Sequence, residues 1–152
     1  ALDKMLSLTR IFHSANYINK GIVEGKKMSV NIVSENFLPQ ADYCGIVSGA
    51  KEAKSKVFEY TLGETGPPII NASPLSMECT VEDIYECNGF QNFICSVAAT
   101  YAEEEVLDTE GKLDYNRLKP VLFEFPTYHY LRTGEVIGHC TDEGKKYKES
   151  LK

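Results

Sequence analysis

Residues 41–58, ADYCGIVSGAKEAKSKVF, combine small residues, hydroxyl groups and cations between two apolar stretches. Gly45 and Gly49 allow tight turns that leave backbone N–H groups and the Ser48 hydroxyl free to point at one spot. Ser55 adds a second hydroxyl, and positive charge comes from Lys51, Lys54 and Lys56. This composition suits a loop that closes around a small anion. On spacing alone, an ordinary helix–loop–helix with solvated lysines is the favoured alternative.

A second polar group stands at the start of a predicted helix. Ser14, Asn16 and Asn19 offer hydroxyl and amide groups there, and Lys20 adds a full positive charge. Free backbone N–H groups and the positive end of the helix dipole attract anions at such a position. The alternative is that these residues only cap the helix and solvate its surface, as polar residues do at many helix N-termini.

The remaining reactive side chains predict no catalytic residue and no metal site. The five cysteines are Cys44, Cys79, Cys87, Cys95 and Cys140; they form no C-x-x-C pair and have no histidine at zinc-like spacing. Cys79, Cys87 and Cys95 are expected in or near the core, and Cys44 is the best candidate for a reactive thiol.

Two charged or aromatic clusters favour structural roles. The run Glu103–Glu105 predicts a solvated edge rather than an acid/base pair, because consecutive side chains alternate in direction. Tyr128 and Tyr130 can stack on a flat ring, but rings in one strand more often form a half-buried packing face. His129 alternates with them and is expected at solvent or at an interface.

Strands and helices must position the two anion-binding candidates. Residues 5–12 and 28–33 alternate apolar and polar side chains, which predicts strands. Residues 16–25 between them predict a helix that stops at Gly25. Short helices are expected on both sides of the glycine loop, at 34–44, where Ser34 serves as cap, and at 53–60.

The second half of the chain is predicted to be rich in strands. Residues 75–87 and 92–101 flank Asn88-Gly89, a dipeptide typical of a two-residue hairpin turn. The second arm, NFICSVAATY, is apolar on both faces and is expected to be the more central strand. Asp114 predicts the cap of one helical turn before a strand at 121–125. The simplest architecture is mainly β with short helices, arranged as a closed or nearly closed barrel.

Composition bounds the class of protein. The 152 residues suffice for one core, so a single domain over residues 1–152 is expected. A net charge of −6 argues against nucleic acid, because the 16 basic residues are interspersed with 22 acidic ones. No apolar run reaches the roughly 18 residues of a membrane helix, and the first residues lack the pattern of a secretory signal. A cytoplasmic protein without a membrane partner is expected.

Five segments share an order and spacing with a known family. They are SANYINKGIVEGKKMSVNIV at 14–33, the 41–58 segment with its flanks, the stretch at 68–81, YAEEEVLDTEGKLDYNRLKPVLF at 101–123 and YHYLRTGEVIG at 128–138. Together they resemble the flavin reductase-like, FMN-binding split-barrel family, especially its flavoredoxin-type branch. The resemblance implies an FMN-binding split β-barrel and a homodimer with FMN near the subunit interface. It places Gly45, Ser48, Gly49, Lys54 and Ser55 near the flavin, and the helix that starts at Asn16 near the phosphate.

Two residues depart from that family. Ile18 stands where members have a threonine that hydrogen-bonds the FMN phosphate, and Ala53 where they often have an aspartate. The family's N-terminal pair of strands also has no counterpart before Ala1, so a shortened member is expected. The leading hypothesis is an FMN-binding flavoredoxin or flavin reductase that receives electrons from NADH, NADPH or a protein donor. The alternatives are a flavin-binding module without turnover and a structural split-barrel remnant without cofactor.

Overall fold

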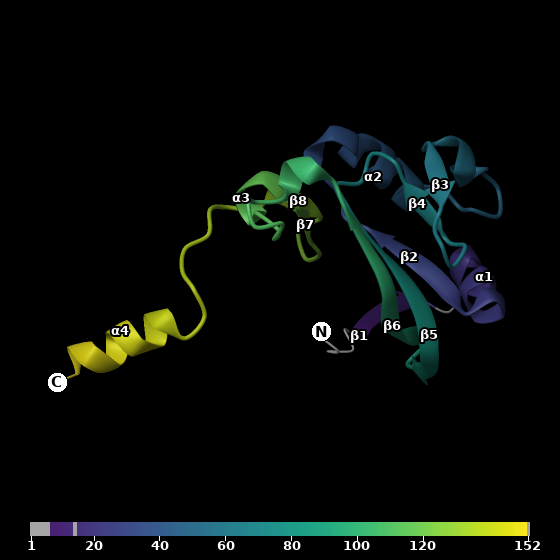
Figure 1. Ribbon diagram of the computed structural model, residues 1–152. Helices are drawn as coiled ribbons and strands as arrows, with labels where there is room; N and C mark the ends of the chain where they lie inside the picture. The colour runs from purple at the N-terminus through teal and green to yellow at the C-terminus, as the bar shows by residue number, and fades with distance from the viewer. Residues whose placement is uncertain (1–6, 14, 152) are drawn as a thin grey trace.

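The computed structural model describes residues 7–13 and 15–151, and it is built mainly of strands with short helices (Figure 1). The strands are β1 (Ser7–His13), β2 (Lys27–Asn31), β3 (Tyr60–Leu62), β4 (Pro68–Ile70), β5 (Leu75–Cys87), β6 (Phe90–Ala102), β7 (Val121–Glu124) and β8 (His129–Arg132). The α-helices are α1 (Tyr17–Gly25), α2 (Leu38–Ile46), α3 (Tyr115–Leu118) and α4 (Asp142–Ser150). Three 3-10 turns are η1 (Glu35–Phe37), η2 (Lys54–Lys56) and η3 (Glu104–Val106). The predicted fold class, mainly β with short helices, is confirmed.

The central sheet has four antiparallel strands in the order β1-β6-β5-β2. Its longest pair is the β5–β6 hairpin, in which Leu75 pairs with Ala102 and Cys87 with Phe90. Asn88 and Gly89 form the turn with φ of 49° and 80°, the positive values that a two-residue hairpin turn requires. The predicted hairpin is therefore confirmed. Both of its arms are inner strands, whereas the second was expected to be the more central one.

The two faces of β5 bury different kinds of side chain, because successive residues of a strand point to opposite sides. One face contributes to the main core, which consists of Ile22, Met28, Cys79, Val81, Phe93 and Cys95. On the other face, Ser76 and Glu78 are 1% and 0% exposed. The β3–β4 hairpin covers them, since backbone N–H groups of Glu64 and Thr65 in its turn donate to the Glu78 carboxylate. The polar residues of this strand are thus buried beneath a hairpin.

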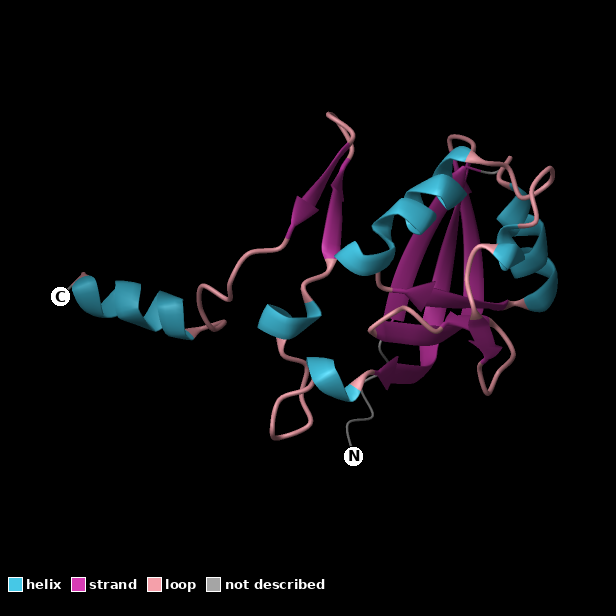
Figure 2. Ribbon diagram, turned by 90° about the horizontal axis from the view of Figure 1, so that it is seen from above, coloured by secondary structure: helices cyan, strands magenta, loops and turns pink. Residues whose placement is uncertain are grey.

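A smaller core forms where the chain leaves β6, from Leu75, Val106 and Leu118. Asp114 caps α3 by accepting a hydrogen bond from the Asn116 backbone N–H at 2.9 Å, as the sequence predicts. The β7–β8 hairpin follows and projects from the body of the molecule, and α4 lies apart from everything else at the C-terminal end (Figure 2).

Several local predictions are wrong. The Ser34 side chain makes no capping hydrogen bond within the described residues, and α2 begins only at Leu38, where Pro39 suits the first helical turn. Residues 53–60 form only η2 before β3 begins. The helix α1 does end at Gly25, as predicted, and Lys26 after it takes the left-handed conformation of the cap, with φ of 53°. Cys87 is exposed, because it lies next to the hairpin turn, beyond the core.

Within the described residues, no continuous backbone ladder closes the predicted barrel, in keeping with the split β-barrel that was expected. The main sheet ends at β1 on one side and at β2 on the other. Beside β2 lies the β3–β4 hairpin, which β2 reaches through side chains: Ser29 donates to the Pro68 carbonyl, and Asn31 accepts from the Ile70 N–H at 2.9 Å. The sheet therefore continues into this hairpin by side-chain contacts rather than by a ladder of backbone bonds.

Candidate functional site

The first turn of α1 is open at its positive end. Asn16 is the N-cap residue, with φ of −66° and ψ of 131°, but its side chain makes no capping hydrogen bond within the described residues. The first turn contains no acidic residue, Ile18 is 55% exposed, and Lys20 is exposed as well. Backbone N–H groups at such a helix end lack partners within the helix. Their partial positive charge allows this end to accept an anion.

Asn19 has a structural role in the same turn. It is only 3% exposed, and its Nδ2 donates to the His13 carbonyl at 3.2 Å and to Gln91 Oε1 at 2.7 Å. Its Oδ1 is buried without a hydrogen-bond partner among the described residues. The Asn19 amide therefore fixes α1 to β1 and β6, and its donor hydrogens are taken up inside the protein. Ser14, predicted for the same group, lies outside the described residues.

The glycine loop meets the first turn of α1. A Cβ atom added at Gly49 would lie 3.0 Å from Cδ1 of Tyr17, so the Tyr17 ring rests against the bare Cα of this glycine. The two segments that the sequence singled out separately are thus neighbours in space. Gly49 has no positive φ. Its missing side chain serves close packing here rather than a special turn conformation.

The other predicted loop residues are held by local bonds. Gly45 lies inside α2 instead of in a turn, so the prediction of a tight turn there is wrong. Ser48 Oγ accepts from the Ala50 N–H at 3.3 Å, and Lys54 Nζ donates to the Cys44 carbonyl at 2.5 Å near the end of α2. Ser55 is exposed in η2. Of this group, Gly49 is the residue that contacts α1, while Lys54 reaches back to α2.

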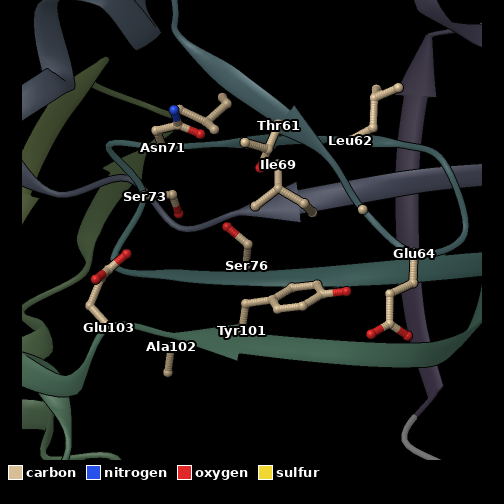
Figure 3. A pocket seen from close by; sticks show the side chains of 12 residues that line it. Thr61, Leu62, Glu64, Ile69, Asn71, Ser73, Ser76, Tyr101, Ala102 and Glu103 are labelled. Carbon is tan, nitrogen blue, oxygen red and sulfur yellow. The ribbon is translucent and has the colours of Figure 1, made fainter.

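A second region, which the sequence reasoning missed, lies between the β3–β4 hairpin and the outer face of β5 and β6. A cavity of about 400 Å³ opens there. Ser76 and Tyr101 line it from the sheet, Ile69 lines it from the hairpin, and Glu64 and Glu103 stand at its two ends (Figure 3). The sequence gives no sign that the turn at 63–68 covers the sheet, but the acidic Glu78 in the middle of the strand LSMECTV was a usable signal.

Glu78 accepts hydrogen bonds from four donors, three in the hairpin turn and one in the sheet. The backbone N–H groups of Glu64 and Thr65 donate to it at 2.8 Å each, and the hydroxyls of Thr65 and Tyr101 donate as well. Burial by itself raises the pKa of this carboxyl, but these hydrogen bonds outweigh it and lower the pKa to about 2. The hydrogen bond to Glu78 in turn raises the pKa of the Tyr101 hydroxyl. Glu78 is therefore ionised at neutral pH.

The close fit around Glu78 explains a glycine in the hairpin. A Cβ atom at Gly63 would collide with the Glu78 carboxylate, and the four hydrogen bonds leave that carboxylate little freedom to move away. Gly63 is therefore required by a close approach and not by its backbone conformation.

The β7–β8 hairpin carries the predicted aromatic cluster. Phe123 lies 5.3 Å from Tyr130 between ring centroids, and Tyr130 donates to Asp42 of α2 at 2.7 Å. Arg132 forms a two-point ion pair with Glu35 at 2.5 and 2.7 Å. His129 is exposed, in agreement with the expectation. Tyr128 lies outside β8 in a left-handed conformation, with φ of 58°.

The described residues contain no group of three or more histidine, cysteine or acidic side chains placed to hold a metal ion. Within the same residues, every helix is too short or too polar to cross a membrane.

Comparisons with known proteins identify relatives. A family model described as a flavin reductase like domain matches residues 8–132. Flavoredoxin from Methanosarcina acetivorans is 32% identical with a TM-score of 0.88, over 93% of this chain and 76% of that one. Flavoredoxin of Desulfovibrio vulgaris (Miyazaki F) is 24% identical with a TM-score of 0.86, over 95% and 79%. An FMN-binding protein from Thermus thermophilus is 18% identical with a TM-score of 0.74, over 88% and 72%, and shows likeness of fold. A comparison with curated proteins found no match.

Proposed function

The chain belongs to the flavin reductase-like family, and we propose on that basis that it binds FMN and passes electrons through the bound flavin. The observation that carries the proposal is the contact between Gly49 and Tyr17, which brings the glycine loop to the open N-terminus of α1. The similarity to flavoredoxin from Methanosarcina acetivorans, at 32% identity, supports the same assignment.

The residues of α1 and the loop fit the phosphate end of such a cofactor. The helix presents an N-terminus without a side-chain cap or an acidic residue in its first turn, and Lys20 adds charge beside it. The proposed contact residues are those predicted from the sequence: Ser14, Asn16, Asn19, Lys20, Gly45, Ser48, Gly49, Lys54 and Ser55. Among them, Asn19 and Lys54 act by fixing α1 and the loop, because their donors are engaged within the protein.

The protein's own part in the reaction is binding and orientation. When bound, FMN supplies a ring system that accepts and returns a hydride or single electrons. The chain holds the phosphate at the positive end of α1, packs the Tyr17 ring against the loop, and keeps both segments in place through Asn19. We propose reduced nicotinamide or a reduced protein as the electron donor.

We further propose that the protein acts as a homodimer. The β7–β8 hairpin exposes large apolar side chains, among them Phe125 at 68% and Leu122 at 51%, and it projects from the body of the molecule (Figure 2). Contiguous apolar surface of this kind marks interaction sites. Sedimentation velocity at micromolar concentration is expected to show a dimer, and a pure monomer would contradict the proposal.

We also propose a cytoplasmic location. All five cysteines lie in the described part of the chain and are free thiols, two of them exposed. Thiols persist in this form in a reducing compartment. Fractionation of cells that produce the protein tests this proposal.

A visible spectrum of the purified chain tests the main proposal most directly. We expect flavin absorption bands, or their appearance and a quench of FMN fluorescence when FMN is added. Bleaching of the bound flavin by NADH or NADPH without oxygen distinguishes a reductase from a flavin-binding module without turnover. Failure to bind added FMN would overturn the proposal.

A further inference from the structure

The cavity between the β3–β4 hairpin and the sheet has the size and lining of a small-molecule site. Its volume of about 400 Å³ lies within the range of roughly 300–1,000 Å³ that is typical of ligand pockets. Ile69 and Ile70 give it an apolar wall, and Ser76 and Tyr101 form the floor on the sheet (Figure 3).

Three hydroxyl groups on the walls, those of Ser73, Ser76 and Tyr101, donate their hydrogens to acceptors inside the protein, while the Thr61 hydroxyl and the Asn71 amide also line the cavity. Ser76 Oγ donates to Asn31 Oδ1 at 2.9 Å, and this oxygen is fixed as an acceptor because the Ile70 backbone N–H donates to it as well. Ser73 Oγ donates to the Leu75 carbonyl at 2.8 Å, and the Tyr101 hydroxyl donates to Glu78. What these three hydroxyls can offer a ligand is lone pairs. A ligand that satisfies them must bring hydrogen-bond donors.

The charges of the cavity have one sign. Glu64 and Glu103 stand at its two ends (Figure 3). The buried carboxylate of Glu78 accepts a hydrogen bond from the Tyr101 hydroxyl in the cavity wall. The lining residues, all within the described part of the chain, include no lysine, arginine or histidine. Lys27 lies near the same hairpin but donates to the Thr65 carbonyl at 2.8 Å. The cavity therefore repels anions and attracts cations.

The cavity is formed before a ligand arrives. Its hairpin wall is tied to the sheet by three hydrogen bonds from Glu64 and Thr65 to Glu78 and by the Asn31 side chain, which joins β2 to β4 and β5. Binding to a preformed site loses less conformational entropy than binding to a mobile site, so the affinity is weakened less.

We propose that this cavity binds an organic ammonium ion with a compact apolar body, held at its charged end by the Glu103 carboxylate and neighbouring hydroxyl oxygens and along its body by Ile69 and Ile70. The Tyr101 ring, which lines the same cavity, offers a face for a cation. This site is separate from the anion-accepting end of α1, so it goes beyond the proposed flavin function. A phosphate group does not suit it.

Three probes that share a benzyl group and differ in charge test the proposal on the full chain. Benzylamine, benzyl alcohol and phenylacetate are titrated while ¹H–¹⁵N NMR spectra are recorded. We expect saturable shifts confined to the lining residues for benzylamine, roughly tenfold weaker binding of the alcohol, and no binding of phenylacetate. Equal binding of phenylacetate, or no shifts at the lining residues with any probe, would overturn the proposal.

A matched pair of variants locates the charge. Glu103→Gln removes one carboxylate of the cavity and is expected to weaken benzylamine binding about three- to tenfold. Glu105→Gln makes the same change at an exposed residue two positions on that does not line the cavity, and should leave binding unchanged. Equal effects of both substitutions would show that only overall charge matters and would refute the site. Because no flavin is added, this result is independent of the FMN proposal.

Discussion

Two polar regions of the chain differ in whether their polar groups have hydrogen-bond partners within the protein. Around Glu78, four donors converge on one buried carboxylate. At the start of α1, the Asn16 side chain caps nothing within the described residues, and Lys20 is exposed. The first region is complete in itself and holds the hairpin to the sheet. The second leaves groups of positive character unpaired, as a site for an anion requires.

The difference teaches that polar groups with a structural role can be distinguished from polar groups with a binding role by whether their hydrogen bonds are already made within the protein. A fully satisfied network contributes to stability, so its loss should appear in unfolding experiments. An open group contributes mainly when a ligand is present, so its loss should appear in affinity. Substitutions in the two regions should therefore change different measured quantities.

The largest effect is expected for Glu78→Ala. The substitution leaves the N–H groups of Glu64 and Thr65 and two hydroxyls without their acceptor, a carboxylate that is itself 0% exposed. Removing the acceptor from several buried donors should lower the free energy of unfolding by roughly 3 kcal/mol or more. Urea denaturation measures it. The control Glu110→Ala, at an exposed acid, should stay within about 0.5 kcal/mol of wild type. Similar small losses for both variants would mean that the network is dispensable.

Acid should reveal the same network without a substitution. The pKa of Glu78 is lowered from 4.5 to about 2 in the folded chain, so the unfolded chain binds the proton more tightly. The stabilisation is therefore complete above pH 4.5 and is lost as the pH falls towards 2. Urea midpoints measured through this window should fall more steeply for wild type than for Glu78→Gln. Parallel slopes would contradict the depressed pKa.

Much of this fold could be predicted from local sequence, and the network could not. The Asn88-Gly89 turn and the Asp114 cap depend on neighbouring residues and were predicted correctly. The Glu78 network joins residues 64, 65, 78 and 101, which come from two elements of the sheet and one distant turn. Sequence periodicity says nothing about which distant turn covers a strand. The acidic Glu78 within an apolar strand indicated a buried polar contact, but its hydrogen-bond donors could be identified only from the fold.

In the candidate site too, local features could be predicted from the sequence, whereas contacts between distant segments could not. Sequence chemistry identified the start of α1 and the glycine loop, but it could not show that Gly49 packs on Tyr17, since that contact depends on how α2 directs the loop. It also assigned Gly45 to a turn, whereas α2 continues through this residue, because helical contacts override the preference of a single glycine.

In the open region, Lys20→Met should change affinity and leave stability alone. Lys20 is exposed and forms no ion pair within the described residues, so the unliganded chain loses little. If Lys20 faces the FMN phosphate, binding should weaken by roughly 1–3 kcal/mol, the value of a charge-assisted hydrogen bond. Quenching of flavin fluorescence gives the affinity, and a thermal melt without FMN gives the stability.

Substitutions of two further lysines serve as controls for the effect of Lys20→Met on FMN affinity. Lys148→Met removes the same charge from α4, which lies apart from the site (Figure 1), and should leave FMN affinity unchanged. Lys54→Met removes the bond to the Cys44 carbonyl and should lower both stability and affinity. An effect of Lys148→Met equal to that of Lys20→Met would reduce the role of Lys20 to overall charge.

The smallest effect, and the finest test of where the phosphate lies, is expected for Ile18→Thr. Ile18 is 55% exposed while Ile22 is 3% exposed, so Ile18 is not part of the core and its replacement costs little packing. A threonine hydroxyl in the first turn of α1 adds a donor beside the open N–H groups. FMN affinity should rise by roughly 0.5–1.5 kcal/mol, the net value of one hydrogen bond, with nearly unchanged melting temperature.

Val23→Thr makes a similar substitution near the other end of the same helix, at a side chain that is 37% exposed, and should bring no gain in affinity. A gain in both variants would point to a general effect on the helix, and a gain in neither would place the phosphate away from α1.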